Sequence, residues 1–91
     1  MTNVIDYIKS HNGLPITSNK LSEAFGLSGF EIRRIVNQAR SEGCPICSCN
    51  KGYYYSEEKE DIEKTVMSLS HRIGSIQRAI RGLSNCLGRR G

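Results

Sequence analysis

The sequence predicts a mainly α-helical fold of the α+β class, in which a small β-hairpin separates three short helices from one long C-terminal helix. Apolar residues recur at helical spacing through residues 2–42, two short segments rich in β-formers follow, and a heptad pattern runs from there toward the C-terminus. The chain has 91 residues, 37% of them hydrophobic. That is enough for one small domain, residues 1–56, and one appendage, residues 57–91.

The first two predicted elements are a helix and a short extended segment. Residues 2–11 carry apolar side chains at helical spacing, and Asn12-Gly13 is a turn signal that ends the helix. Pro15 disfavours helix at the residue before it and has no amide hydrogen to donate. Residues 14–16 are therefore expected to be extended.

The second predicted helix covers residues 19–25, with Thr17 or Ser18 as its N-cap. Gly26 breaks this helix, and Leu27 is expected to fill the turn that follows. The inward residues are expected to be Leu21, Ala24 and Phe25.

The third predicted helix begins after Ser28 and reaches residue 42. Ser28 and Glu31 have the spacing of a capping box, and Gly43 is a natural C-terminal stop. Apolar residues at i, i+3, i+4 and i+7 form its inward stripe. These residues are Ile32, Ile35, Val36 and Ala39.

A β-hairpin is predicted after the third helix. Residues 45–49 and 52–56 are rich in β-formers and are joined by Asn50-Lys51-Gly52, with Gly52 allowing a tight turn. Side chains alternate along a strand, so two of the three consecutive tyrosines share one face. We expect Tyr53 and Tyr55 in the core and Tyr54 half-exposed on the other face. A helix capped by Ser56 is expected to follow.

This order of elements is the ground plan of a winged helix-turn-helix followed by a long heptad-repeat helix. Residues 14–55, 42 of the 91, resemble the N-terminal DNA-binding domain of biotin-operon repressors and related bacterial and phage regulators. The resemblance is carried by the run Ile16-Thr-Ser-Asn-Lys-Leu-Ser-Glu-Ala-Phe-Gly-Leu-Ser28 and by Glu42-Gly-Cys-Pro-Ile46 followed by Lys51-Gly-Tyr53. In the resembling stretch, the small Ser22 lies where the second helix of the motif crosses closely over the first. The resemblance implies binding to double-stranded DNA; the ligase domain of those repressors is missing, so no catalytic role carries over.

The outward face of the third helix is predicted to contact DNA. Arg33 and Asn37 are four residues apart and can enter a major groove together, where arginine suits guanine and asparagine suits adenine. Arg34 and Arg40 lie further round the helix, where they suit phosphates, and Lys51 suits a phosphate or the minor groove. The alternative is an exposed face that only confers solubility. The full predicted DNA-binding set is Ser28, Gly29, Phe30, Arg33, Arg34, Asn37, Gln38, Arg40, Lys51 and Tyr54.

The C-terminal segment carries an apolar heptad spaced 4-3-4-3-4-3-4, which predicts a helix that pairs with another helix. Its members are Ile62, Val66, Leu69, Ile73, Ile76, Ile80, Leu83 and Leu87. The alternative for its first two turns is packing on the chain's own body. We expect self-association, as a dimer or a higher oligomer whose number the pattern leaves open. Gly74 and Gly82 lower the helix propensity by roughly 1 kcal/mol each, so the helix is expected to order on assembly.

Charge divides the chain into three parts. Residues 1–55 carry a net charge of +2, residues 56–70 of −3 and residues 71–91 of +5, which together give +4. A basic body and a basic tail are typical of a protein that contacts a polyanion at two places. A solvated charged surface is the alternative.

The four cysteines and two histidines suggest no catalytic or redox site. Cys44, Cys47 and Cys49 could begin a zinc knuckle, but a second spaced pair of ligands is lacking. We therefore expect reduced thiols, no metal and no cofactor. No apolar run is long enough to cross a membrane, so we expect no membrane contact and a cytoplasmic location.

These observations predict a small oligomeric DNA-binding protein that is not an enzyme, acting as a transcriptional regulator of bacterial or phage type. The alternative is a replication or packaging adapter of a mobile element. Such an adapter would mark a DNA site with the winged helix and oligomerise through the C-terminal helix.

Overall fold

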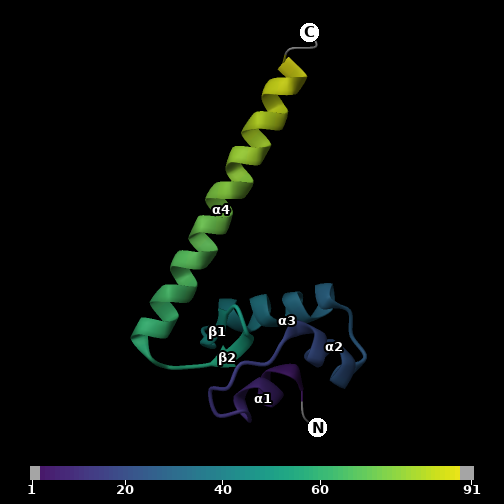
Figure 1. Ribbon diagram of the computed structural model, residues 1–91, viewed down its shortest axis with the longest axis vertical. Coiled ribbons are helices and arrows are strands. Elements are labelled where there is room, and N and C mark those ends of the chain that lie inside the picture. The colour runs from purple at the N-terminus through teal and green to yellow at the C-terminus, as the bar shows by residue number, and fades with distance from the viewer. Residues whose placement is uncertain (1–2, 89–91) are drawn as a thin grey trace.

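The computed structural model describes residues 3–88, so Arg89 and Arg90 of the basic tail lie outside the described residues. This part of the chain is mainly helical, with one two-stranded antiparallel hairpin. The elements are α1 (Val4–Lys9), α2 (Ser18–Phe25), α3 (Gly29–Ser41), β1 (Ile46–Cys49), β2 (Gly52–Tyr55) and α4 (Lys59–Gly88). A body made of α1 to β2 lies at one end of α4, which extends away from it over most of the 55 Å length of the molecule (Figure 1).

Side-chain caps define the starts of the first three helices. The carboxamide oxygen of Asn3 accepts from the Asp6 amide at 2.8 Å, and the Thr17 hydroxyl accepts from the Lys20 amide at 3.1 Å. Ser28 and Glu31 form the predicted capping box, each side chain bonding the other's backbone amide. The first helix is shorter than the range 2–11, because Asn3 caps its start and Ser10 its end; the turn at Asn12, with positive φ, follows.

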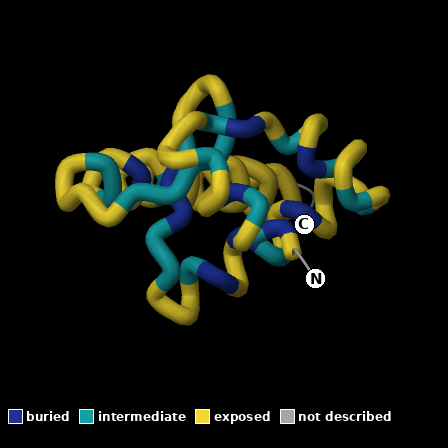
Figure 2. The backbone as a smooth tube through the Cα atoms, turned by 90° about the horizontal axis from the view of Figure 1, so that it is seen from below, coloured by how far each residue is buried: buried dark blue, intermediate teal, exposed yellow. Residues whose placement is uncertain are grey.

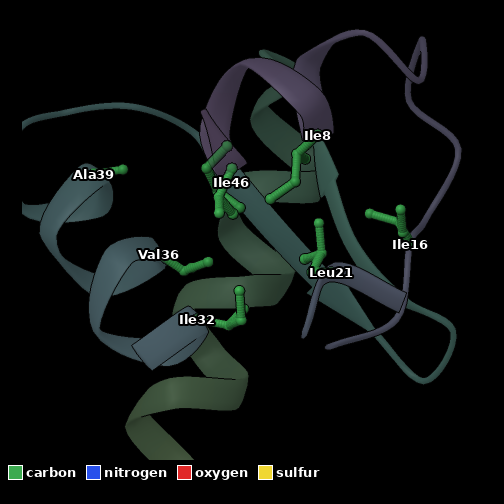
Figure 3. Packing of buried hydrophobic residues seen from close by; sticks show 8 residues of the cluster. Ile8, Ile16, Leu21, Ile32, Val36, Ala39 and Ile46 are labelled. Carbon is green, nitrogen blue, oxygen red and sulfur yellow. The ribbon is translucent and has the colours of Figure 1, made fainter. Parts of the chain in front are cut away.

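The core lies between α1, α2, α3 and the hairpin. Figure 3 shows side chains from all four meeting in one space, and Figure 2 shows the buried positions within the body. Its buried members are Val4, Ile8, Ile16, Leu21, Ile32, Val36, Ala39 and Ile46.

One predicted core residue, Ala24, is exposed. Leu21 and Phe25 set the direction in which α2 packs, and Ala24 lies outside the arc that they cover. The half-buried Ser22 sits on the inner side instead, and its hydroxyl donates to the Leu27 carbonyl, which closes the turn before α3. Gly26 has φ +64° at this turn, a conformation that favours glycine.

The hairpin is joined to the segment before α2 by a single β-bridge. Ile46 pairs with Tyr55, and Cys49 pairs with Gly52 at the tip. Ile16 and Tyr53 exchange two backbone hydrogen bonds of 2.8 and 2.9 Å, so residue 16 pairs with β2 in an isolated bridge. The hairpin is thereby fixed to the N-cap region of α2.

The three tyrosines lie on the faces predicted from alternation. Tyr53 and Tyr55 pack against the core, and the Tyr55 hydroxyl donates to a Glu57 carboxylate oxygen at 2.8 Å. Tyr54 is half-buried and lies outside the core cluster.

Helix α4 begins at Lys59, later than a cap at Ser56 would place it. The Ser56 hydroxyl accepts from the Glu58 amide and donates to Asp61, which turns the chain before the helix starts. Thr65 is buried against β1, where its hydroxyl accepts from the Ser48 amide at 3.3 Å. The first turns of α4 therefore pack on the body. No helix within residues 3–88 is long and apolar enough to cross a membrane.

Candidate nucleic-acid interface

The first turn of α2, the outward face of α3, the hairpin tip and the third and fourth turns of α4 surround a groove of about 580 Å³. We call it the basic groove, because four cationic side chains line it: Arg33, Arg40, Lys51 and Arg72. The neutral polar residues that line it are Thr17, Ser18, Asn19, Asn37, Ser48, Asn50 and Ser68.

The positive charge of the basic groove is uncompensated. None of the residues that line it is Asp or Glu. Among residues 3–88 the ion pairs are Lys59–Glu63 and Lys64–Glu60, both on the first turns of α4 and away from the groove. Several cations with no carboxylate between them create a positive potential that attracts anions.

Arg33 and Asn37 both line the basic groove and both are exposed. They lie on one face of α3 because they are four residues apart, while the residues that face inward hold the opposite side of the helix against the core. Lys51 stands at the hairpin tip, on the rim of the same groove. With Arg40, the structure thus brings together four residues from the predicted DNA-binding set.

Arg40 lines the groove but is half-buried rather than exposed. Its Nε donates to the Ile46 carbonyl at 2.7 Å, and its guanidinium lies 5.8 Å from the centre of the Tyr53 ring. Its Nη2 is buried and has no hydrogen-bond partner. Burial lowers the pKa of Arg40, and the positive charge of Arg72 lowers it further. Arg40 thus ties α3 to β1 while placing a positive charge beneath the groove.

Arg34 and Gln38 lie outside the basic groove, although the sequence grouped them with Arg33. They line a second, more apolar groove of about 750 Å³ between α1 and α3. Gln38 donates to a Glu42 carboxylate oxygen at 2.9 Å, and the Arg34 guanidinium lies 6.0 Å from the Phe30 ring centre. Consecutive residues of a helix point about 100° apart, so Arg33 and Arg34 line different grooves on either side of the exposed face of α3.

The remaining predicted residues have other environments. The Ser28 side chain is engaged in the capping box, and Gly29 lies where an added Cβ would be 3.8 Å from the Ser18 hydroxyl. Phe30 is exposed. Tyr54 is absent from the lining of the groove and lies near Asp61 at the start of α4; burial, followed by the negative charge of Asp61, raises the pKa of its hydroxyl.

Several residues that line the groove were not predicted from sequence. Ser18 and Asn19 lie in the first turn of α2, where a cap was expected but no ligand. Ser68 and Arg72 come from α4; the sequence analysis connected the basic residues 71–91 with a polyanion but named neither residue as part of a site. The excess of arginine after residue 70 was the one signal pointing to Arg72.

The apolar heptad of α4 has two environments. Ile62 and Leu69 are half-buried in the contact with the chain's own β1, so the body takes up part of the predicted oligomerisation stripe. The other members are exposed, and we call them the seam: Val66, Ile73, Ile76, Ile80, Leu83 and Leu87.

No family model, curated protein or solved structure matches the chain.

The cysteines do not gather into a metal site. Within residues 3–88, no three His, Cys, Asp or Glu side chains are placed to hold a metal ion together. Cys47 is buried on β1, and burial raises the pKa of its thiol, while Cys49 is exposed near the hairpin tip. The basic groove, with four cationic residues and no Asp or Glu in its lining, is the feature of the body whose charge suits an anion.

Proposed function

We propose that the protein binds double-stranded DNA through the basic groove, with α3 entering the major groove and the hairpin acting as a wing. The observation that carries this proposal is the meeting of Arg33, Asn37 and Lys51 in one groove with four cations and no lining carboxylate. Arginine and asparagine offer two-pronged contacts to guanine and adenine, each discriminating by roughly 1–3 kcal/mol. Lysine at the tip supplies a phosphate contact that sets the position of the protein on the duplex.

The arrangement of the body supports a winged helix-turn-helix. Helix α2, the turn at Gly26 and helix α3 follow one another as in a helix-turn-helix, and the hairpin comes directly after α3. The bridge at Ile16 joins the segment 14–16, which was predicted to be extended, to the hairpin. In this interpretation α3 is the recognition helix, and the protein is a binding protein and regulator rather than an enzyme.

Self-association through α4 forms the second part of the proposal. The six seam residues are more than half exposed, and five of them follow one another from Ile73 to Leu87 beyond the body. An apolar row of this length in water favours pairing with a second copy of the chain. Two linked bodies make the second DNA contact intramolecular, so a modest affinity per body suffices.

The test begins with selection of preferred duplexes from a random pool, followed by fluorescence anisotropy on the selected duplex. Arg33→Ala is expected to cost roughly 1–3 kcal/mol on that duplex and to relax preference at one base pair. Arg34→Ala is the matched control, because it removes the same charge from the next residue of α3 but outside the groove. Equal losses in the two variants, with no change in base preference, would contradict recognition by this face of α3.

Stoichiometry separates a regulator from an adapter of a mobile element. Light scattering of the protein alone and with the selected duplex gives the number of subunits. Two or four subunits fit a regulator, whereas a larger ring favours the adapter.

A further inference from the structure

Helix α4 forms one wall of the basic groove. Ser68, Leu69 and Arg72 line it together with the outward residues of α3 and the hairpin tip. Ser68 and Arg72 are exposed and lie four residues apart, so both project from the same side of α4. The long helix therefore presents polar and cationic groups to the space in which α3 would meet DNA.

Packing fixes the position of this wall. Thr65 is buried and accepts a hydrogen bond from the Ser48 amide, and Leu69 is half-buried against the body one turn later. Arg72 follows Leu69 by three residues, on the side of α4 that faces the body. The contact of α4 with the body therefore fixes the position of Arg72, and the seam residues take no part in it.

Arg72 adds charge where charge is already uncompensated. Arg72 and Arg40 line the same groove, and the Nη2 of Arg40 is buried without a hydrogen-bond partner. Two guanidinium groups facing one groove with no carboxylate lining it repel each other, and an anion bound between α3 and α4 relieves that repulsion.

We propose that Arg72 binds a backbone phosphate of the same duplex that α3 reads, so that α4 is part of the DNA interface as well as the helix that self-associates. This inference rests on the proposed function. A phosphate fits better than a base edge because Arg72 lies on α4, whereas Arg33 and Asn37 lie on α3, and the planar guanidinium matches the geometry of phosphate oxygens.

The experiment measures affinity for the selected duplex over a range of salt concentrations. Loss of one phosphate contact lowers the slope of log K against log salt by about 0.9. Arg72→Ala is expected to show that decrease and about a fivefold weaker affinity at physiological salt, equally for matched and mismatched duplexes. Arg72→Lys, which keeps the charge, is expected to restore most of the slope.

Arg78→Ala is the matched control, because Arg78 is an exposed arginine on the same helix but lines no part of the groove. It is expected to leave the slope within error of the unmodified protein. Sedimentation coefficients of both variants are measured as well, since a dissociated oligomer would also lose affinity.

The outcomes separate the two proposals. If Arg33→Ala weakens binding while Arg72→Ala and Arg78→Ala behave alike, the inference about α4 is wrong and the proposed function stands. If the unmodified protein binds no duplex, both are wrong. A lower slope in Arg72→Ala alone, at an unchanged sedimentation coefficient, supports the phosphate contact.

Discussion

Replacing two seam residues by aspartate is expected to dissociate the protein without unfolding its body. Ile76 and Ile80 are 54% and 58% exposed in the single chain, so this is the part of each side chain that a partner helix can bury. Full burial of an isoleucine side chain stabilises by about 1.5–3 kcal/mol. Scaled by the exposed fraction, each contributes about 0.8–1.7 kcal/mol, and the four side chains of a dimer contribute about 3–7 kcal/mol.

The double variant Ile76→Asp with Ile80→Asp loses this contribution and must also desolvate four carboxylates to assemble. The self-association constant is therefore expected to fall by at least about a hundredfold, since about 1.4 kcal/mol corresponds to a factor of ten. Sedimentation velocity over a range of protein concentrations measures the change. Circular dichroism checks that the body remains folded, as its separate core at Ile32 and Val36 requires.

A matched control places the same two charges elsewhere on α4. Ser75→Asp with Asn85→Asp adds two carboxylates at exposed positions outside the seam and is expected to keep the oligomer. An unchanged sedimentation coefficient in the seam variant would refute the reasoning and leave the exposed row of α4 without a partner. Dissociation in both double variants would show that added charge alone, and not loss of the seam, disrupts assembly.

Two further predictions concern the hairpin. Gly52 has φ +127°, and a Cβ added there would overlap the backbone of Ile16; at Gly43 φ is +91° but the space is open. Gly52→Ala is therefore expected to lower the melting temperature more than Gly43→Ala. Equal melting temperatures would argue against the bridge at residue 16. Burial raises the pKa of Cys47, so the folded state holds that proton more tightly than the unfolded state. The protonated Cys47 thiol therefore makes its full contribution to the free energy of unfolding below about pH 8.5, and this contribution is lost as the pH rises further. In native protein a thiol reagent is expected to modify Cys49 quickly and Cys47 only on unfolding, and equal rates would contradict its burial.

Local signals in the sequence predicted the elements well. Caps and turns depend on a few neighbouring residues, so Thr17, Ser28 with Glu31, and Gly26 could be assigned their roles before any tertiary contact was known. The inward stripe of α3 was predicted for the same reason, because its period follows from helix geometry alone.

Contacts between elements were harder to predict. The sequence placed Arg33 and Arg34 in one DNA-binding set, yet the two residues line different grooves. The packing of α3 on α1 and α2 decides which side of α3 faces the hairpin, and the sequence does not reveal that packing. Ala24 was wrongly predicted to face the core, because α2 packs through Leu21 and Phe25 and the side of the helix that carries Ala24 stays exposed. The place of Arg72 in the basic groove depends on a contact between residues distant in sequence, and the excess of arginine after residue 70 was the one sign of it.

The attachment of α4 has a mechanical consequence. The other walls of the basic groove are cross-tied, since the bridge at Ile16 joins the hairpin to α2 and Arg40 joins α3 to β1. Helix α4 is attached by its first turns only, and about 28 Å of helix extends from Leu69 to Gly88. A rigid helix attached at one end amplifies small rotations: turning α4 by about 10° at the groove would displace its far end by about 5 Å. In an assembly joined through the seam, the width of each groove and the distance between the two bodies would change together.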